Sequence, residues 1–189
     1  IMDYKKINRR NFIKQSALAS ASLAFMPSRM SASTKKFPNL RLGVIGTGLR
    51  GQWMTNLCLL RNDVDIKAIC DIDSEMINKT LNIIKKAGGK PPDVYKNGEH
   101  DFLNLMQRDD LDAVYIATPW EWHHPMAVSA MKQGKHVGVE CPAALKIKDL
   151  WDLVNVSEKE EKHCMLMENV CYRRDVMAVL NMVRSGLLE

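Results

Sequence analysis

The stretch RLGVIGTGLRG, residues 41–51, decides the fold. Its first half is an apolar run typical of a buried strand, and residues 49–60 have the pattern of a helix. Between strand and helix, three glycines have the spacing G-x-G-x-x-G: Gly46, Gly48 and Gly51. The first permits a tight turn, the second a close backbone approach to a pyrophosphate, and the third close helix–strand packing. We therefore predict a dinucleotide site here, with the helix N-terminus facing the phosphates.

An acidic residue supports this interpretation. Asp71 ends the next predicted strand, residues 65–71, and lies 20 residues after Gly51. A carboxylate there accepts hydrogen bonds from both adenosine ribose hydroxyls and repels a 2′-phosphate, which favours NAD over NADP. The alternative is a glycine turn with a helix-capping aspartate.

The rest of the chain alternates short apolar runs with longer amphipathic ones. After residue 71, strands are predicted at residues 94–95, 112–117, 136–140 and 163–168, and helices at 75–86, 101–107, 125–133, 148–161 and 175–185. This alternation predicts the α/β class: a Rossmann-type, doubly wound parallel sheet with helices on both faces.

Aromatic and imidazole side chains gather in the segment TPWEWHHP, residues 118–125, which is predicted as a loop. It follows a strand, and ligands bind beyond the carboxyl ends of strands in open α/β sheets. Trp120 and Trp122 either stack on a ligand or fill the core. Adjacent histidines rarely point at one metal and no further ligand has suitable spacing, so no metal is predicted.

The charge distribution excludes an obvious nucleic-acid surface. The 189 residues carry a formal charge of +5, from 27 Lys and Arg against 22 Asp and Glu. Residues 1–33 hold six basic residues and one acidic residue, so the remainder is neutral. We predict no nucleic-acid partner. The longest apolar stretch, residues 17–26, is too short for stable membrane insertion.

Residues 1–33 have the layout of an export signal. Arg9-Arg10, followed by Phe12 and Lys14, precedes a weakly apolar segment from Ser16 to Met26 and then small residues. This resembles a twin-arginine signal peptide and predicts a periplasmic or extracellular bacterial protein. The alternative is an amphipathic surface helix. The five cysteines show no C-x-x-C spacing and are interpreted as buried small hydrophobes.

Together, the glycine turn, Asp71, Thr118-Pro119, GKHV at 134–137 and Glu140-Cys141-Pro142 resemble the Gfo/Idh/MocA family, from Leu40 to the chain end. TPWEWH, HVGVECPAAL and residues 164–186 are similar to glycoside hydrolase family 109, whose members are NAD-holding, exported bacterial α-N-acetylgalactosaminidases. The resemblance implies an NAD-binding Rossmann domain at residues 38–168. It also implies that residues 169–189 begin a truncated C-terminal substrate domain.

The resemblance also implies cofactor contacts. Leu49 and Arg50 would lie at the phosphates and Asp71 at the ribose, while residues 120–123 would line the nicotinamide side. The full set is Gly46, Gly48, Leu49, Arg50, Gly51, Asp71, Thr118, Trp120, Glu121, Trp122, His123, Glu140, Cys141 and Asn169. Sugar dehydrogenases of the wider family usually have E-K-P where this chain has Glu140-Cys141-Pro142. Because cysteine supplies no ammonium group, ordinary dehydrogenation is in doubt.

The implied function is a glycosidase that works by transient oxidation at sugar C3, elimination, water addition and re-reduction. Tyr172 is the local candidate for acid–base catalysis; the alternative is a buried tyrosine beside the sheet edge. Further catalytic residues would lie in the missing domain. Two other hypotheses stay open: an NAD-dependent sugar or polyol oxidoreductase, and an inactive truncated nucleotide-binding fragment. The expected partner is a sugar or glycoside, with homo-oligomer formation through the missing domain left open.

Overall fold

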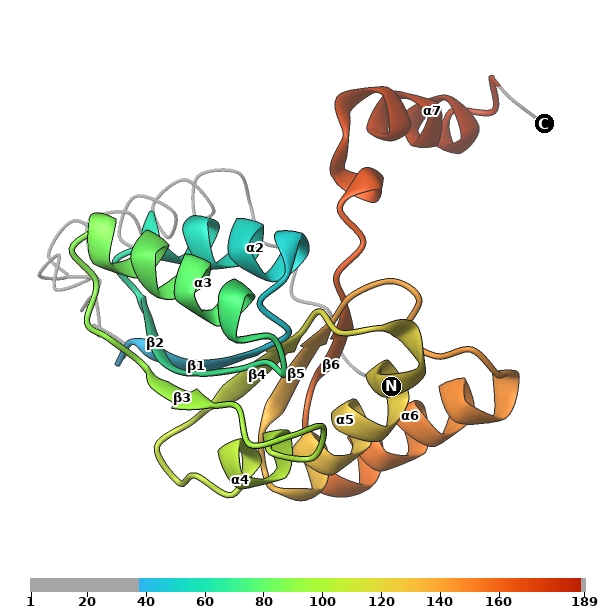
Figure 1. The fold of residues 1–189 in the computed structure, drawn as a ribbon. Helices are drawn as coiled ribbons and strands as arrows, with labels where there is room; N and C mark the ends of the chain where they lie inside the picture. Colours follow the sequence, from blue (N-terminus) through green and yellow to red (C-terminus); the bar gives the residue numbers. More distant parts are fainter. Residues whose placement is uncertain (1–37, 188–189) are drawn as a thin grey trace, which may run out of the picture. The chain divides into compact units, whose positions relative to one another are not determined.

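The computed structural model describes residues 38–187, so the predicted signal at residues 1–33 lies outside the described residues. The described part contains a six-stranded parallel sheet in the order β3-β2-β1-β4-β5-β6 (Figure 1). The strands are β1 (Leu40–Ile45), β2 (Val64–Cys70), β3 (Asp93–Tyr95), β4 (Ala113–Ile116), β5 (His136–Val139) and β6 (Cys164–Leu166). This order confirms the predicted doubly wound sheet. From β1, the chain first adds strands on one side, β2 and β3, and then on the other, β4 to β6, so the switch point lies between β1 and β4.

Helices cover both faces of the sheet (Figure 1). One face carries α2 (Leu49–Leu59) and α3 (Ser74–Lys86). The other carries α4 (Phe102–Met106), α5 (Trp120–Lys132) and α6 (Ile147–Glu160). After β6 come the short 3₁₀ helix η1 (Val170–Tyr172) and α7 (Arg174–Arg184). Within the described residues, no helix combines the length and apolarity needed to cross a membrane.

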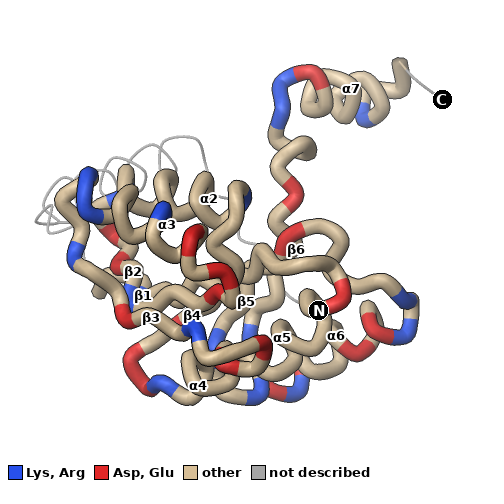
Figure 2. Tube along the Cα trace, in the orientation of Figure 1, with Lys and Arg blue, Asp and Glu red and all other residues tan. Residues whose placement is uncertain are grey.

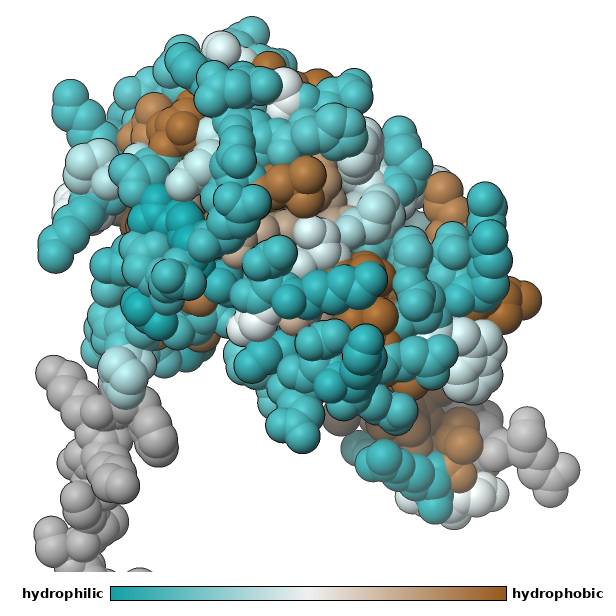
Figure 3. Space-filling view, turned by 90° about the horizontal axis from the view of Figure 1, so that it is seen from below, coloured by the Kyte–Doolittle hydropathy of each residue, from teal (hydrophilic) through white to brown (hydrophobic). Residues whose placement is uncertain are grey.

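The core lies on the two faces of the central strands. Val44, Ile45, Val114 and Ile116, from β1 and β4, are almost fully buried because both strands are covered on both sides. Charged residues of both signs are interspersed along the described chain (Figure 2). The face seen from below is mostly hydrophilic, with apolar side chains in separate spots (Figure 3).

The structure corrects one element boundary that matters for the site. The prediction of a loop over residues 118–125 was wrong, because α5 begins at Trp120 and contains Pro125. A proline commonly occupies the first position of a helix, so the sequence predicts a start at Pro125. Instead Pro119, with φ −55° and ψ 147°, is the N-cap residue that ends the extended chain.

The five cysteines are all free thiols. Cys58 and Cys70 are buried, as predicted, and burial raises the pKa of the Cys70 thiol to about 12. Cys141 and Cys164 are only half-buried and Cys171 is exposed, so the prediction of full burial was wrong for these three. Cys171 lies in η1, which contains no buried residue.

Candidate functional site: the nucleotide turn

The three glycines of the turn differ in what a side chain would meet at each position. Gly46 has φ +87°, and a Cβ there would lie 2.5 Å from the Ala117 carbonyl oxygen. A Cβ on Gly51 would lie 1.9 Å from the Gly46 carbonyl oxygen, so strand and helix touch through backbone. A Cβ on Gly48 would meet nothing within 4 Å. The turn is therefore closed at its first and third glycines and open above the second, as a pyrophosphate requires.

The N-terminus of α2 offers free hydrogen-bond donors at this opening. Gly48 is the N-cap residue, no side chain caps the helix, and its first turn holds no acidic residue. Since the first N–H groups of a helix have no partner inside it, they attract an anion together with the helix dipole. Leu49, the first residue of α2, is 87% exposed at this opening. The residues present fit a dinucleotide phosphate.

Asp71 follows β2 and is bound to the glycine turn. Its Oδ2 accepts hydrogen bonds from the Thr47 backbone N–H (2.5 Å) and the Thr47 hydroxyl (2.9 Å). Its Oδ1 accepts one from the Asp73 N–H at 2.9 Å. The cap of α3 is Asp73, which accepts from the N–H groups of Glu75 and Met76. The alternative of Asp71 as the helix cap was therefore wrong, and its carboxylate lies beside the turn, where a ribose acceptor is needed.

Three of the predicted residues meet at a second cluster. Arg50 in α2 donates from Nε to Glu140 Oε1 at 2.8 Å. It also reaches Asn169 Oδ1 at 3.5 Å, and its guanidinium lies 4.5 Å from the ring centre of Trp53. The hydrogen bond from Arg50 to Glu140 raises the pKa of Arg50, although burial opposes this. The structure thus brings together residues that follow β1, β5 and β6.

Sequence reasoning missed one member of this cluster. Tyr115, in β4, donates its hydroxyl to the same Glu140 Oε1 at 2.5 Å. The signal was present, because a tyrosine in the apolar strand DAVYIA needs a partner for its hydroxyl. Burial, followed by the hydrogen bond to Glu140, raises the pKa of Tyr115. The tyrosine is therefore a neutral donor at physiological pH.

The structure does not bring residues 120–123 to one surface, since successive helical residues turn by about 100°. Trp120 and Glu121 are exposed. Trp122 packs edge-on against the rings of His100 and Phe102, with centroids 5.5 and 5.9 Å away, so the core-filling alternative holds for this tryptophan.

His123 has a structural role, because its buried ring links two backbone segments. It is 1% exposed, and its ring nitrogens lie 2.7 Å from the Pro142 carbonyl oxygen and 2.8 Å from that of Thr118. Because both nitrogens are engaged with backbone carbonyls, the ring joins the segment after β4 to the segment after β5. It therefore positions the neighbourhood of Thr118 and Glu140 without presenting a free nitrogen.

Cys141 and Tyr172 lie near the Arg50 cluster. Cys141 Sγ is 3.3 Å from Glu168 Oε2, and burial, followed by the contact with Glu168, raises the pKa of this thiol to about 11. It is therefore a neutral group at pH 7. Tyr172 is 74% exposed, so the alternative of a buried tyrosine was wrong. It lines a cavity of about 200 Å³ together with Arg50, Trp53, Met54, Met165, Met167, Glu168 and Asn169.

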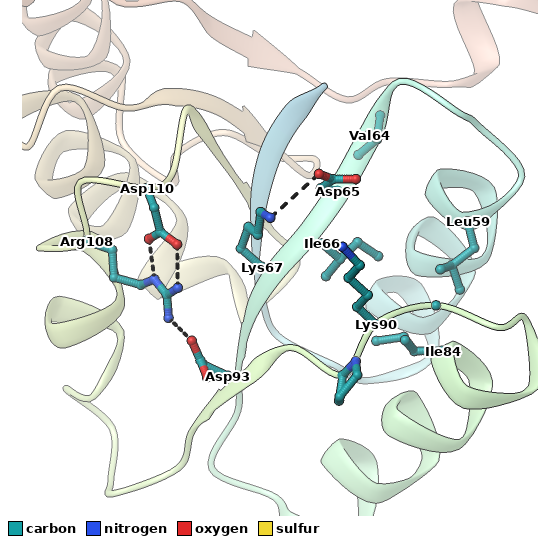
Figure 4. Close-up of a pocket in the computed structure, with 12 residues that line it drawn as sticks. Leu59, Val64, Asp65, Ile66, Lys67, Ile84, Lys90, Asp93, Arg108 and Asp110 are labelled. Atoms are coloured by element: carbon teal, nitrogen blue, oxygen red, sulfur yellow. Dashed lines mark hydrogen bonds and ion pairs between the residues drawn. The ribbon is translucent and has the colours of Figure 1, made fainter. Parts of the chain in front are cut away.

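A separate cavity of about 390 Å³ lies at the amino ends of β2 and β3 (Figure 4). Most of its charges are paired: Arg108 contacts Asp93 at 2.5 Å and Asp110 at 2.7 Å, and Lys67 lies 3.6 Å from Asp65, while Lys90 also lines the cavity. Ligands in doubly wound sheets bind at the opposite, carboxyl ends of the strands. This cavity therefore does not contribute to the nucleotide turn.

Residues 38–187 include no group of three histidine, cysteine or carboxylate side chains placed to hold a metal ion. His124, one of the two adjacent histidines, contacts Asp152 of α6 through Nε2 at 2.9 Å. The other is His123, whose nitrogens face carbonyl oxygens.

Comparison with known proteins agrees with this geometry. The sequence model described as "Oxidoreductase family, NAD-binding Rossmann fold" (Gfo/Idh/MocA) matches residues 40–168. A glycosyl hydrolase family 109 protein of Saccharopolyspora erythraea is 43% identical over 95% of this chain and 43% of its own length. An α-N-acetylgalactosaminidase of Tannerella forsythia is 46% identical over 95% of this chain and 42% of its own length. The chain thus spans less than half the length of these curated relatives.

Solved structures show the same fold. The scyllo-inositol dehydrogenase of Lactobacillus casei with bound NAD(H) and scyllo-inositol superposes with a TM-score of 0.67 and 21% identity. The match covers 78% of this chain and 42% of the dehydrogenase. The glycine turn, the acid after β2 and the family match over 129 residues lead to one assignment. The chain belongs to the Gfo/Idh/MocA oxidoreductase family and carries its NAD-binding Rossmann domain.

Proposed function

We propose that this chain is the NAD-binding part of an exported glycosidase that acts on α-N-acetylgalactosaminides. The observation that carries the proposal is the 46% identity to the α-N-acetylgalactosaminidase of Tannerella forsythia over 95% of this chain. The chain spans 43% and 42% of the length of the two curated relatives, so the activity we propose is that of a whole protein of their length.

The residue after Glu140 supports a glycosidase over a simple dehydrogenase. Cys141 stands where an ammonium group would polarise a reacting hydroxyl, and its thiol is neutral because its pKa is raised to about 11. A neutral thiol beside Glu168 offers only a weak hydrogen bond. The chain therefore supplies no cation of its own at this position to drive net oxidation of a sugar.

The proposed cofactor contacts come from the glycine turn with Asp71 and from the cluster of Arg50, Glu140 and Asn169. The α2 N-terminus and Arg50 would hold the pyrophosphate, and Asp71 the adenosine ribose. Glu140 and Asn169 would lie on the nicotinamide side. When bound, NAD supplies reversible hydride transfer at sugar C3, so the reaction needs no paired carboxylates of the usual glycosidase kind.

The chain's own part in the sugar chemistry is proton transfer. A carbonyl at C3 acidifies the C2–H bond; removal of that proton expels the aglycone from C1, and water then adds at C1. Tyr172 is our proposed proton-transfer residue, since its exposed ring lines a cavity with Arg50 and Asn169. Tyr172→Phe is expected to lower the rate of glycoside cleavage without loss of NAD affinity.

The assay uses the whole protein loaded with NAD and a nitrophenyl α-N-acetylgalactosaminide. Nitrophenol release without net NADH is expected. NADH formation from a free sugar or polyol, with no glycoside cleavage, would favour the oxidoreductase alternative. NAD binding with neither activity would favour a nucleotide-binding protein without turnover.

We also propose export through the twin-arginine route, supported by Arg9-Arg10 and the layout of residues 1–33. A cofactor that is regenerated within each turnover suits a compartment without a free NAD pool. Replacing both arginines by lysines should retain the protein in the bacterial cytoplasm. Unchanged export of that variant would refute the assignment.

A further inference from the structure

Tyr115 is buried, yet its hydroxyl belongs to the cluster formed by Arg50, Glu140 and Asn169. The side chain is 3% exposed and packs among apolar residues on the α2 side of the sheet. On the neighbouring strand β5 it lies opposite Gly138, where a Cβ would sit 3.8 Å from the tyrosine ring. The ring is therefore confined, and its hydroxyl has a fixed direction toward Glu140.

The Glu140 carboxylate accepts both of its described hydrogen bonds at the same oxygen. Tyr115 donates to Oε1 at 2.5 Å, and Arg50 donates Nε to the same Oε1 at 2.8 Å. Arg50 therefore meets Glu140 through one nitrogen and not through the parallel two-bond arrangement that arginine and carboxylate usually prefer. Its terminal nitrogens are held only by the long 3.5 Å contact with Asn169 and by the nearby Tyr115 hydroxyl, which contributes to the raised pKa of Arg50.

We propose that Tyr115 is a positioning residue for the NAD site: its hydroxyl fixes Glu140 in a one-bond contact with Arg50 and so leaves the Arg50 terminal nitrogens for the pyrophosphate. Without that hydroxyl, Glu140 would turn and accept from two N–H groups along one edge of the guanidinium, in competition with the phosphate. The inference rests on the NAD site of the family and not on the proposed glycosidase activity.

The test is NAD affinity, measured by calorimetry on the chain and its variants. Tyr115→Phe retains the buried ring and is expected to bind NAD about tenfold more weakly, the effect of one hydrogen bond to a charged group. The matched control is Tyr95→Phe, whose hydroxyl lies 3.4 Å from Arg108 at the other cavity. This control is expected to bind NAD like the wild type.

A second variant separates positioning from general destabilisation. In a Glu140→Gln background the competing carboxylate is absent, so Tyr115→Phe is expected to weaken NAD binding no further. An equal loss in both backgrounds is what a merely structural role produces, and it would overturn the proposal. So would wild-type affinity in Tyr115→Phe. A wild-type chain without NAD affinity would overturn the cofactor site itself, and the inference with it, whatever the glycosidase assay shows.

Discussion

Replacing Gly51 by alanine should destabilise the folded domain at the nucleotide turn. The new Cβ would lie 1.9 Å from the Gly46 carbonyl oxygen and 2.9 Å from its carbon, whereas real Cβ contacts stay above 3.0 Å. Both neighbours are backbone atoms, so α2 must move away from β1 by about 1 Å, against a packed core. Overpacking of this kind costs about 3 kcal/mol, which corresponds to roughly 10 °C in Tm.

Gly48→Ala is the matched control for this variant. Gly48 has φ −64°, which alanine adopts readily, and its Cβ would meet nothing within 4 Å. We expect Gly48→Ala to unfold at the wild-type urea concentration or slightly above it, while NAD affinity falls at least about tenfold because the methyl group fills the approach to the pyrophosphate. Urea unfolding and NAD calorimetry on both variants give the answer. Wild-type stability of Gly51→Ala would refute the steric reasoning, and wild-type NAD affinity of Gly48→Ala would refute the placement of the phosphates.

Three further predictions concern the framework of the domain. His123→Phe removes the imidazole that lies against the carbonyl oxygens of Thr118 and Pro142 and should cost about 2 kcal/mol in urea unfolding; an unchanged midpoint would contradict the framework role. Arg108→Ala should cost about 1 kcal/mol, since Asp93 and Asp110 lose their common partner but stay in contact with water, and NAD affinity should not change, because the Arg108 cavity lies at the opposite ends of the strands. Hydrogen bonds from the Asn97 N–H and the Asn104 side chain lower the pKa of Asp101 below its ordinary 3.8. The unfolded state therefore binds the proton first as pH falls, and the stability from this group is present above about pH 4 and lost below it. Asp101→Asn should make the pH dependence of unfolding between about pH 4 and 2 shallower, and an identical acid profile would show that this carboxylate contributes nothing.

The parallel sheet could be predicted from the sequence because its signals are local. Short apolar runs alternating with amphipathic stretches specify strands and helices, and right-handed crossovers leave few ways to order them. The glycine turn and Asp71 were equally readable, since spacing along the chain fixes their place at a strand end. The start of α5 was not, because both Pro119 and Pro125 are compatible with a helix N-terminus and only tertiary packing distinguishes them.

The arrangement of side chains within the site was less predictable. Tyr115 reaches Glu140 from a neighbouring strand, 25 residues away in sequence, and no local pattern encodes that contact. The burial of His123 and the partial burial of Trp122 follow from helical geometry, which the expected loop lacked. Motif resemblance gave a set of candidate residues, whereas it did not show which of them face the cofactor and which support it from behind.

The bonds between Asp71 and Thr47 limit how the cofactor preference of this domain can be redesigned. The usual way to admit NADP is to remove the acid after the second strand, but here that acid also accepts from the backbone N–H within the glycine turn. A substitution that also removes the side-chain oxygen, such as alanine, leaves the N–H of Thr47, a fully buried residue, without its acceptor. A successful exchange must keep a short side-chain oxygen at position 71, such as that of serine or asparagine, and place the new positive charge elsewhere.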